Sequence, residues 1–199
     1  ITSSNNWRFI IRNLAVDVTG ATTVVAGTWY HVAGVYNGTT ATLYVNGVSD
    51  GTAATAGSAV INGENVLIGA RNFGGPTQHF GGTVDEVRIW NVARSSGQIT
   101  ANMNCDVAQN ANLVAYYRFD QGTASGTNTG LTCAYDYSGN SNSGTLTNMA
   151  LSGSSSNYVL GHVPGCNTIT LPSPGTFSGN APVCVGSTIT LSNANANGV

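Results

Sequence analysis

The sequence predicts an all-β protein, an antiparallel β-sandwich, from one clear hairpin and a series of short strands separated by turn residues. The hairpin lies in Gly27–Gly47, GTWYHVAGVYNGTTATLYVNG, where apolar residues alternate on both sides of Asn37-Gly38. An Asn-Gly pair readily supplies the positive φ of a tight hairpin turn. This stretch therefore predicts two antiparallel strands joined at Asn37-Gly38.

Short apolar stretches recur along the chain at the spacing expected of a sandwich. The predicted strands, in chain order, are Trp7–Arg12, Val16–Val18, Thr22–Val25, Tyr30–Tyr36, Ala41–Val45, Val66–Ala70, Thr83–Trp90 and Leu113–Phe119. The last strand alternates between an apolar face and a mixed one. Between strands, the Gly, Ser, Thr and Asn residues of 121–130 predict an exposed loop.

One helical turn is predicted shortly after the strand at 83–90. Ser95 and Gln98 have the spacing of a capping box, in which each side chain accepts a hydrogen bond from the backbone of the other residue. Helix is otherwise nearly absent from the pattern, as expected of an all-β protein.

The composition is that of a neutral protein of one domain, or of one domain with a fragment of another. Of 199 residues, 7% are charged, none is lysine, and the formal net charge is −2. The six arginines are scattered along the sequence, so we expect no electrostatic surface for nucleic acid or anionic lipid. No apolar run approaches the ~20 residues of a membrane span, so no membrane insertion is expected. Because Ile1–Asn6 lack the features of a signal peptide, an export signal would lie upstream.

The four cysteines predict two disulfides rather than a zinc site, because no C-x-x-C spacing occurs. They are Cys105, Cys133, Cys166 and Cys184. Three pairings are open, and we favour Cys105 with Cys133 and Cys166 with Cys184, since each pair would close a loop within one structural unit. The alternative is a set of buried free thiols in a cytosolic protein.

Several motifs in this order carry a resemblance to a known family. The hairpin at 27–47 is followed by FGGTVDEVRIWNVARSSGQI at Phe80–Ile99, by LVAYYRFDQG, and by D-x-S-G-N-x-N-x-G-T-L beginning at Asp136. Together they resemble the laminin-G-like members of the concanavalin A-like jelly-roll superfamily, especially repeats of large surface proteins of the Bacteroidetes. The resemblance implies a jelly-roll sandwich in a secreted, extracellular protein at the cell surface.

The same resemblance divides the chain into two parts. Residues 1–163 are predicted to form a laminin-G-like sandwich that lacks its usual first strands, since no F-D-G-x-x-D-Y-V type motif precedes Trp7. Either those strands are cut off, or a neighbouring chain or domain supplies them by β-strand addition. Residues 164–199 are predicted to be a linker and a partial immunoglobulin-like or PKD-like segment, because V-C-V-G-S-T-I-T-L resembles the opening strands of such modules. An extended arm and a disordered tail are the alternatives.

A calcium site is predicted at the D-x-S-G-N turn. Hard cations prefer carboxylate, amide and backbone oxygens, which a Gly- and Asn-rich turn can direct inward. The resemblance places such a turn near the Asp of the V-D-E-V strand, so the predicted ligands of Ca²⁺ are Asp85, Asp136 and Asn140. In the alternative, the Asp and Asn side chains of the turn bond only their own backbone.

A sugar site is predicted in the loop at 71–79, which combines an aromatic ring with amide and charged side chains. The candidate ligand-binding residues are Arg71, Asn72, Phe73, Gln78 and His79. The alternative is an ordinary hairpin loop with Phe73 tucked inward.

No catalytic residues are assigned, and we expect the protein not to be an enzyme. Glycosidases need two carboxylates that face each other across a sugar. Asp85 and Glu86 are adjacent in a predicted strand and would point to opposite faces. We therefore predict an adhesion module that binds a glycan or another cell-surface partner, with calcium. The alternative is a structural subunit of an extracellular filament, assembled by strand sharing between copies of itself.

Overall fold

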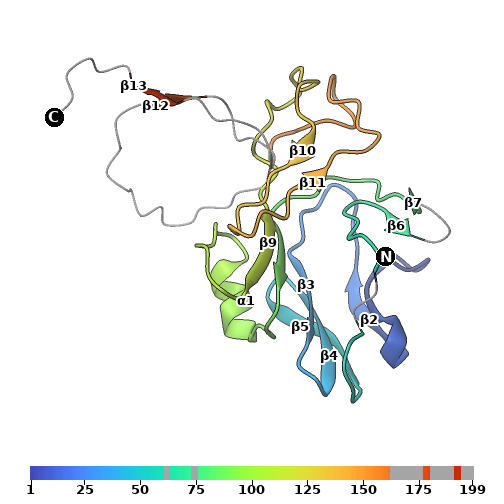
Figure 1. Ribbon diagram of the computed structural model, residues 1–199. Coiled ribbons are helices and arrows are strands. Elements are labelled where there is room, and N and C mark those ends of the chain that lie inside the picture. Colours follow the sequence, from blue (N-terminus) through green and yellow to red (C-terminus); the bar gives the residue numbers. More distant parts are fainter. Residues whose placement is uncertain (61–62, 73–75, 162–176, 180–190, 194–199) are drawn as a thin grey trace. The chain divides into compact units, whose positions relative to one another are not determined.

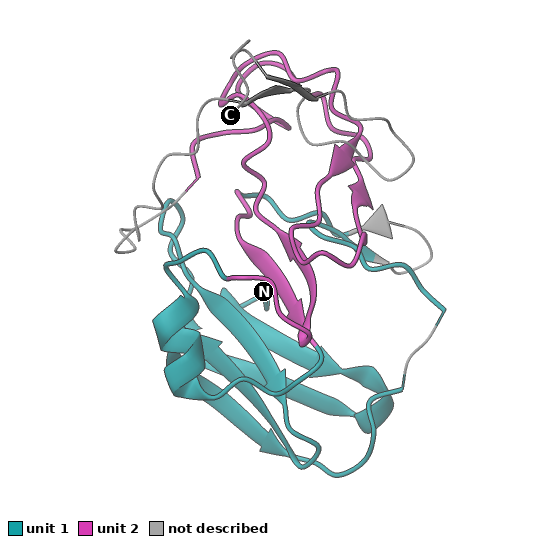
Figure 2. Ribbon diagram, turned by 60° about the vertical axis from the view of Figure 1, so that its left-hand side comes forward, with its two compact units in different colours: residues 1–82, 91–107 teal, residues 83–90, 108–199 magenta. Residues whose placement is uncertain are grey.

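The computed structural model describes residues 1–60, 63–72, 76–161, 177–179 and 191–193. The chain divides into two compact units (Figure 2), which are described separately below. Unit 1 comprises residues 1–82 and 91–107, and unit 2 comprises residues 83–90 and 108–199. Antiparallel strand pairs make up most of the regular structure in both, which confirms the predicted all-β class.

Unit 1 begins with a hairpin and continues with a three-stranded meander (Figure 1). The hairpin strands are β1 (Asn6–Ile11) and β2 (Val16–Thr23), joined by the 3₁₀ turn η1 (Arg12–Leu14). The meander strands are β3 (Val32–Tyr36), β4 (Thr40–Val45) and β5 (Val48–Ala54). The unit also contains the short pair β6 (Arg71–Asn72) and β7 (Pro76–Thr77) and the helix α1 (Ser96–Asn102).

The turns of the meander follow from two Asn-Gly pairs. At the predicted turn, Asn37 Oδ1 accepts hydrogen bonds from the backbone N–H groups of Thr39 and Thr40, and Gly38 has a φ of +96°. Asn46 and Gly47 also have positive φ, at 50° and 79°, and connect β4 to β5. The first hairpin is therefore confirmed at its predicted turn, and an Asn-Gly turn also ends the next strand.

The core of unit 1 lies between the hairpin and the meander. Val16 and Val18 of β2 and Ala41 and Leu43 of β4 are buried in one cluster, with Leu43 only 1% exposed. Strand alternation turns one face of the hairpin toward this cluster and the other toward solvent. At roughly 25 cal/mol per Å² of apolar area, burial of such side chains is the main source of stability for a unit of this size.

Helix α1 confirms the capping box. The Ser95 side chain accepts a hydrogen bond from the backbone of Gln98, and the Gln98 side chain accepts one from the backbone of Ser95. The helix continues to Asn102, beyond the one turn predicted, and buries Ile99. No helix in the described part of the chain is long and apolar enough to cross a membrane.

Unit 2 is built on the antiparallel pair β8 (Val87–Trp90) and β9 (Leu113–Tyr117). A second, two-residue pair joins β10 (Cys133–Ala134) to β11 (Gly144–Thr145). The buried cluster consists of Ala115, Tyr117 and Ala134, as the predicted apolar face of 113–119 requires. Most of the predicted second part of the chain, 164–199, lies outside the described residues, apart from the pair β12 (Phe177–Gly179) and β13 (Leu191–Asn193).

Three strand predictions were wrong in detail. Residues 66–70 form no strand, and Val66 is 70% exposed. Strand β8 begins at Val87 rather than Thr83, because Glu86 adopts a φ of 53°, which is incompatible with extended backbone. The segments 16–18 and 22–25 belong largely to one strand, β2, which passes through Gly20 and ends at Thr23.

Two of the cysteines lie in the described residues, and neither is a free thiol. Cys105 and Cys133 are each disulfide-bonded. Cys105 lies in unit 1 and Cys133 in unit 2, so the reasoning that this pair closes a loop within one unit does not hold. Cys166 and Cys184 lie outside the described residues, and the pairing of the four cysteines stays a prediction.

Gly34 provides a test of the packing in unit 1, because the ring of Phe9 lies directly over it. A Cβ added at Gly34 would lie 2.6 Å from Phe9 Cδ2. We expect Gly34→Ala to lower the free energy of unfolding by about 1–3 kcal/mol, the usual cost of overpacking. Gly81→Ala is the matched control, since nothing lies within 4 Å of its added Cβ. Urea unfolding measures both, and equal stabilities would contradict this packing.

Candidate functional site

The loop at residues 136–144, here called the Asp136 loop, is organised by one buried carboxylate. Asp136 is 5% exposed. Its Oδ1 accepts hydrogen bonds from the backbone N–H groups of Tyr116 and Ser138, both at 2.9 Å. Its Oδ2 lies 2.8 Å from the Ser138 hydroxyl and accepts a bond from Asn142 N at 2.9 Å. Four donors thus surround the two oxygens of Asp136.

These contacts hold Asp136 in its ionised form. Burial alone would raise its pKa, but the hydrogen bonds to the carboxylate, led by that from the Ser138 backbone, lower the pKa below the ordinary value. A carboxylate has about four lone-pair positions. Because four donors occupy them, the charge of Asp136 is compensated by groups of the Asp136 loop and of β9.

The amide side chains of the same loop bond the backbone of β9. Asn140 Nδ2 donates to Leu113 O at 2.7 Å, and Asn142 Nδ2 donates to Val114 O at 2.9 Å. The backbone N–H of Tyr137 donates to Tyr116 O at 2.8 Å. One edge of β9 pairs with β8. The Asp136 loop supplies hydrogen-bond partners at β9 in place of a further strand.

The predicted calcium ligands therefore have other partners. Asp136 and Asn140 belong to the hydrogen-bond network just described, and Asp85 Oδ1 accepts a bond from Glu86 N at 3.0 Å. Among the described residues, no three His, Cys, Asp or Glu side chains form a group that could hold a metal ion. The geometry favours the alternative in which the turn residues bond backbone, and the calcium site stays a prediction.

Glu86 joins a hydrogen-bond network with Tyr116 and Arg88. The Tyr116 hydroxyl donates to Glu86 Oε2 at 2.5 Å, and the Arg88 guanidinium forms an ion pair with the same oxygen. The guanidinium carbon of Arg88 also lies 5.0 Å from the centre of the Tyr116 ring. Burial first, and then the bond to Glu86, raise the pKa of Tyr116. This network stabilises the start of β8 against β9.

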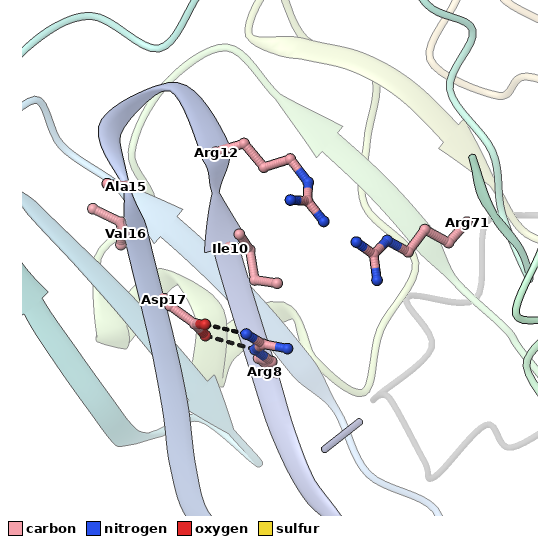
Figure 3. A pocket seen from close by; sticks show the side chains of 7 residues that line it. All are labelled: Arg8, Ile10, Arg12, Ala15, Val16, Asp17 and Arg71. Carbon is pink, nitrogen blue, oxygen red and sulfur yellow. Dashed lines mark hydrogen bonds and ion pairs between the residues drawn. The ribbon is translucent and has the colours of Figure 1, made fainter. Parts of the chain in front are cut away.

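The pocket shown in Figure 3 lies in unit 1, on the face of the β1–β2 hairpin opposite the core. Its volume is about 420 Å³, within the range of small-molecule sites. The lining residues come from the hairpin, its turn and β6, and are Arg8, Ile10, Arg12, Ala15, Val16, Asp17 and Arg71. The pocket is thus formed mainly by one strand pair and closed by a residue far along the chain.

Three arginines and one carboxylate give this pocket its charge. Arg8 bonds both carboxylate oxygens of Asp17, with Arg8 Nε at 2.6 Å from Asp17 Oδ1. The hydrogen bonds from Arg8 lower the pKa of Asp17. Arg12 makes no hydrogen bond or ion pair within the described part of the chain, and Arg71 Nη1 donates to Gln78 Oε1 at 2.9 Å. Three of the six arginines, which are scattered in the sequence, therefore line one pocket.

The structure connects this pocket to part of the predicted sugar site. Arg71 lines the pocket, and Gln78 accepts a hydrogen bond from Arg71. His79 is exposed. Asn72 belongs to β6, and Phe73 lies outside the described residues, so neither orientation of its ring is tested. The sequence analysis missed Arg8 and Arg12. The alternate spacing of Arg8, Ile10 and Arg12 was the available signal, since Arg8 and Ile10 share one face of β1 and Arg12 follows directly after the strand.

The chain belongs to the concanavalin A-like lectin/glucanases superfamily, because the model of a laminin G family with this description matches residues 1–100. The fold is similar to that of a provisionally assigned carbohydrate-binding protein from Bacteroides ovatus, with 26% sequence identity and a TM-score of 0.52. This similarity covers 63% of the present chain and 36% of the Bacteroides protein. The chain therefore spans about a third of that relative.

A second solved structure shows a weaker similarity. It is an S-layer domain-containing protein from Clostridium thermocellum, 24% identical, with a TM-score of 0.38 over 44% of this chain and 45% of that one. This likeness is too low to support an inference. No curated protein matches the sequence.

The Asp136 network predicts a specific pH dependence of stability. Asp136→Asn places an N–H₂ donor among groups that themselves donate. We therefore expect the variant to have a free energy of unfolding about 2–3 kcal/mol lower than the wild type at neutral pH. Because folding lowers the pKa of Asp136, the stability it contributes is complete above the unfolded value, near 3.9, and is lost as pH falls through the folded value. The difference in free energy of unfolding between wild type and variant should therefore become smaller as pH falls below about 4.

Chemical unfolding of both proteins between pH 7 and pH 2 measures this difference, with Asp106→Asn as the control because Asp106 is exposed. If the difference in free energy of unfolding between wild type and Asp136→Asn stays constant with pH, the charge of the Asp136 carboxylate is not its cause.

Proposed function

We propose that this chain is a non-enzymatic carbohydrate-binding module of a secreted bacterial protein that acts in adhesion. The observation that carries the proposal is its similarity to the Bacteroides ovatus protein, within a superfamily of lectins and glucanases. The pocket on the β1–β2 hairpin supplies a site of suitable size, with guanidinium, carboxylate and aliphatic groups. Such a combination can bond sugar hydroxyls and orient one ring.

The chemistry of the pocket favours binding over hydrolysis. Glycosidases of the usual kind place two carboxyl groups on either side of the scissile bond. The pocket lining contains one carboxylate, Asp17, and Arg8 bonds both of its oxygens. A carboxylate held ionised in this way is a poor proton donor, so the pocket lacks a general acid.

A specific observation also favours a second function, that of a structural subunit which shares strands between copies. Val66, Leu67 and Ile68 are 70%, 39% and 38% exposed, although their sequence predicts a strand. An apolar segment of this kind can pair with an edge of another chain. In this case assembly, rather than a glycan, would be the main activity.

The first proposal predicts binding without cleavage. We expect the full chain to bind at least one polysaccharide on a glycan array, and to release no reducing sugar from it during prolonged incubation. Release of reducing ends would show an enzyme, and absence of binding to any polysaccharide would reject the proposed function. Chelation of calcium should leave binding unchanged, because Asp136 uses its acceptor positions within the chain. Loss of binding on chelation would instead support the calcium site.

The second function predicts self-association through residues 66–68. Light scattering should then find assemblies that Val66→Ser dissociates, since the change removes exposed apolar surface. Val25→Ser is the control, because Val25 is also an exposed valine, at 59%, but lies outside this segment. A monomer at all concentrations would exclude the structural role, whereas dissociation by both variants would place the contact elsewhere.

A further inference from the structure

One tyrosine hydroxyl in unit 2 is buried without a hydrogen-bond partner. Tyr158 is 6% exposed, and its hydroxyl neither donates to nor accepts from any group in the described part of the chain. A buried hydroxyl without a partner is destabilising, and native proteins retain few of them. A water molecule or a ligand is the partner that such a group requires.

The loop around Tyr158 fixes the position of this hydroxyl. An added Cβ at Gly122 would lie 2.3 Å from Tyr158 Cγ, so the ring lies directly on the Gly122 backbone. Ser125 N donates to Tyr158 O at 2.8 Å. The preceding residue, Asn157, accepts a hydrogen bond at 2.8 Å from the side chain of Asn128, which is itself buried. The unpartnered hydroxyl is therefore held in place before any ligand binds.

Asp120 is the charged group near this hydroxyl. It lies two residues before Gly122, on which the Tyr158 ring packs. Burial first, and then the charge of Asp120, raise the pKa of Tyr158. No hydrogen bond joins the two side chains. The carboxylate and the phenol hydroxyl thus interact through space, and a hydroxyl group that donates to one and accepts from the other would connect them.

Asp120 also has acceptor positions to spare. The Tyr137 hydroxyl donates to Asp120 Oδ1 at 3.1 Å, and Arg118 Nη2 lies 3.0 Å from Asp120 Oδ2. A carboxylate has about four lone-pair positions, and these contacts use two of them. The Asp120 side chain is 45% exposed. In contrast to the buried Asp136, it is an accessible acceptor for hydroxyl groups from outside the chain.

Two half-buried tyrosine rings belong to the same place. The ring centres of Tyr135 and Tyr137 lie 4.9 Å apart, with 74° between the ring planes. The guanidinium carbon of Arg118 lies 5.0 Å from the centre of the Tyr137 ring, so the Tyr135 ring is the less covered of the two. An aromatic ring beside hydrogen-bonding groups is a suitable contact for a sugar, which has an apolar C–H face and hydroxyls at its edge.

The charges of this place favour a neutral ligand. Arg118 is engaged by the carboxylate of Asp120 and by the Tyr137 ring, so its charge is already balanced. The acceptor positions that remain on Asp120 attract hydroxyl donors and repel a second anion. Neutral sugars have several such donors, whereas carboxylated or sulfated sugars also bring a negative charge toward Asp120.

We propose that Asp120, Tyr135, Tyr137 and Tyr158, here called the Asp120 site, bind a neutral polysaccharide. One sugar hydroxyl donates to Asp120 and accepts from the Tyr158 hydroxyl, while the Tyr135 ring contacts the C–H face of the sugar. Because the Tyr158 hydroxyl is buried in the free protein, the exposed Asp120 side chain moves aside as the sugar enters. This inference rests on the proposed carbohydrate-binding function and adds a sugar site in unit 2.

The first test compares neutral polysaccharides with charged forms of the same polymers. We expect the full chain to bind at least one of dextran, mannan and xylan. The sulfated form of that polymer should bind at least about tenfold more weakly, because sulfation removes hydroxyl donors and adds negative charge. A sulfated form that binds as tightly as the neutral polymer would overturn the proposal.

Tyr158→Phe separates a binding role from a structural one, because it removes the hydroxyl alone. We expect the affinity for the neutral polymer to fall about threefold to tenfold, the usual effect of one lost hydrogen bond. The melting temperature should not fall, since the free protein loses no hydrogen bond. A hydroxyl with only a structural role would not weaken binding while leaving stability intact.

Tyr117→Phe is the matched control for this substitution. Tyr117 is also a buried tyrosine of unit 2, at 8% exposed, but its hydroxyl donates to Asn142 O at 2.6 Å. Removal of this hydroxyl should lower the melting temperature by a few degrees and leave the affinity unchanged. An equal loss of affinity in Tyr117→Phe and Tyr158→Phe would show a general effect on unit 2 and would overturn the proposal.

Asp120→Asn tests the carboxylate. We expect it to weaken binding about tenfold or more, because hydrogen bonds to a charged group are the stronger ones. Asp106→Asn is the control, since it removes the same charge from an exposed residue of unit 1. Equal losses in the two variants would indicate a response to net charge and contradict the Asp120 site.

The remaining outcomes distinguish the site from the function. If neutral polysaccharides bind and Tyr158→Phe leaves their affinity unchanged, the Asp120 site is wrong and the carbohydrate-binding function stands. A lower melting temperature of Tyr158→Phe would show that the hydroxyl has a structural partner, and would also overturn the site. Failure to bind any polysaccharide, neutral or charged, would reject the proposed function itself.

Discussion

The Asp136 carboxylate is the interaction on which unit 2 most depends. It is charged and buried, a combination that is costly unless donors compensate the charge. Three backbone N–H groups and one hydroxyl provide this compensation, and two of the four donors lie outside its immediate turn, at Tyr116 and Asn142. The same contacts fix β9, whose other edge pairs with β8. One side chain therefore stabilises a strand, a loop and the packing of the cluster between them.

In unit 1, the alternation of a single strand separates side chains that pack in the core from side chains that line the pocket. Trp7, Phe9 and Ile11 of β1 pack against the core, whereas Arg8 and Ile10 face the pocket. The core residues set the position of the strand, because Phe9 lies on Gly34 without space for a side chain there. Val16 belongs to both sets, since it lines the pocket and is buried in the core cluster. Along β1, a shift of one residue in register would exchange the core face and the pocket face.

Much of the fold could be predicted from the sequence where local rules act alone. The Asn37-Gly38 turn and the Ser95 capping box both depend on residues within a few positions of each other, and both were confirmed. Strand β5 has no apolar alternation, and it forms because β4 offers it a hydrogen-bonded edge. The pocket was missed for a similar reason, since Arg71 meets Arg8 and Arg12 only through tertiary folding. Arg71 itself was predicted, from its loop, as a candidate ligand-binding residue.

The use of side chains in place of a strand beside β9 has a consequence for amide hydrogen exchange. In an ordinary sheet, the protection of a strand amide reports the separation of two backbones. The Tyr116 amide donates instead to a carboxylate, so its protection depends on the charge of one side chain. Its exchange rate would therefore reveal the opening of this loop separately from the unfolding of the sheet, and acid would accelerate that opening before the β8–β9 pair separates.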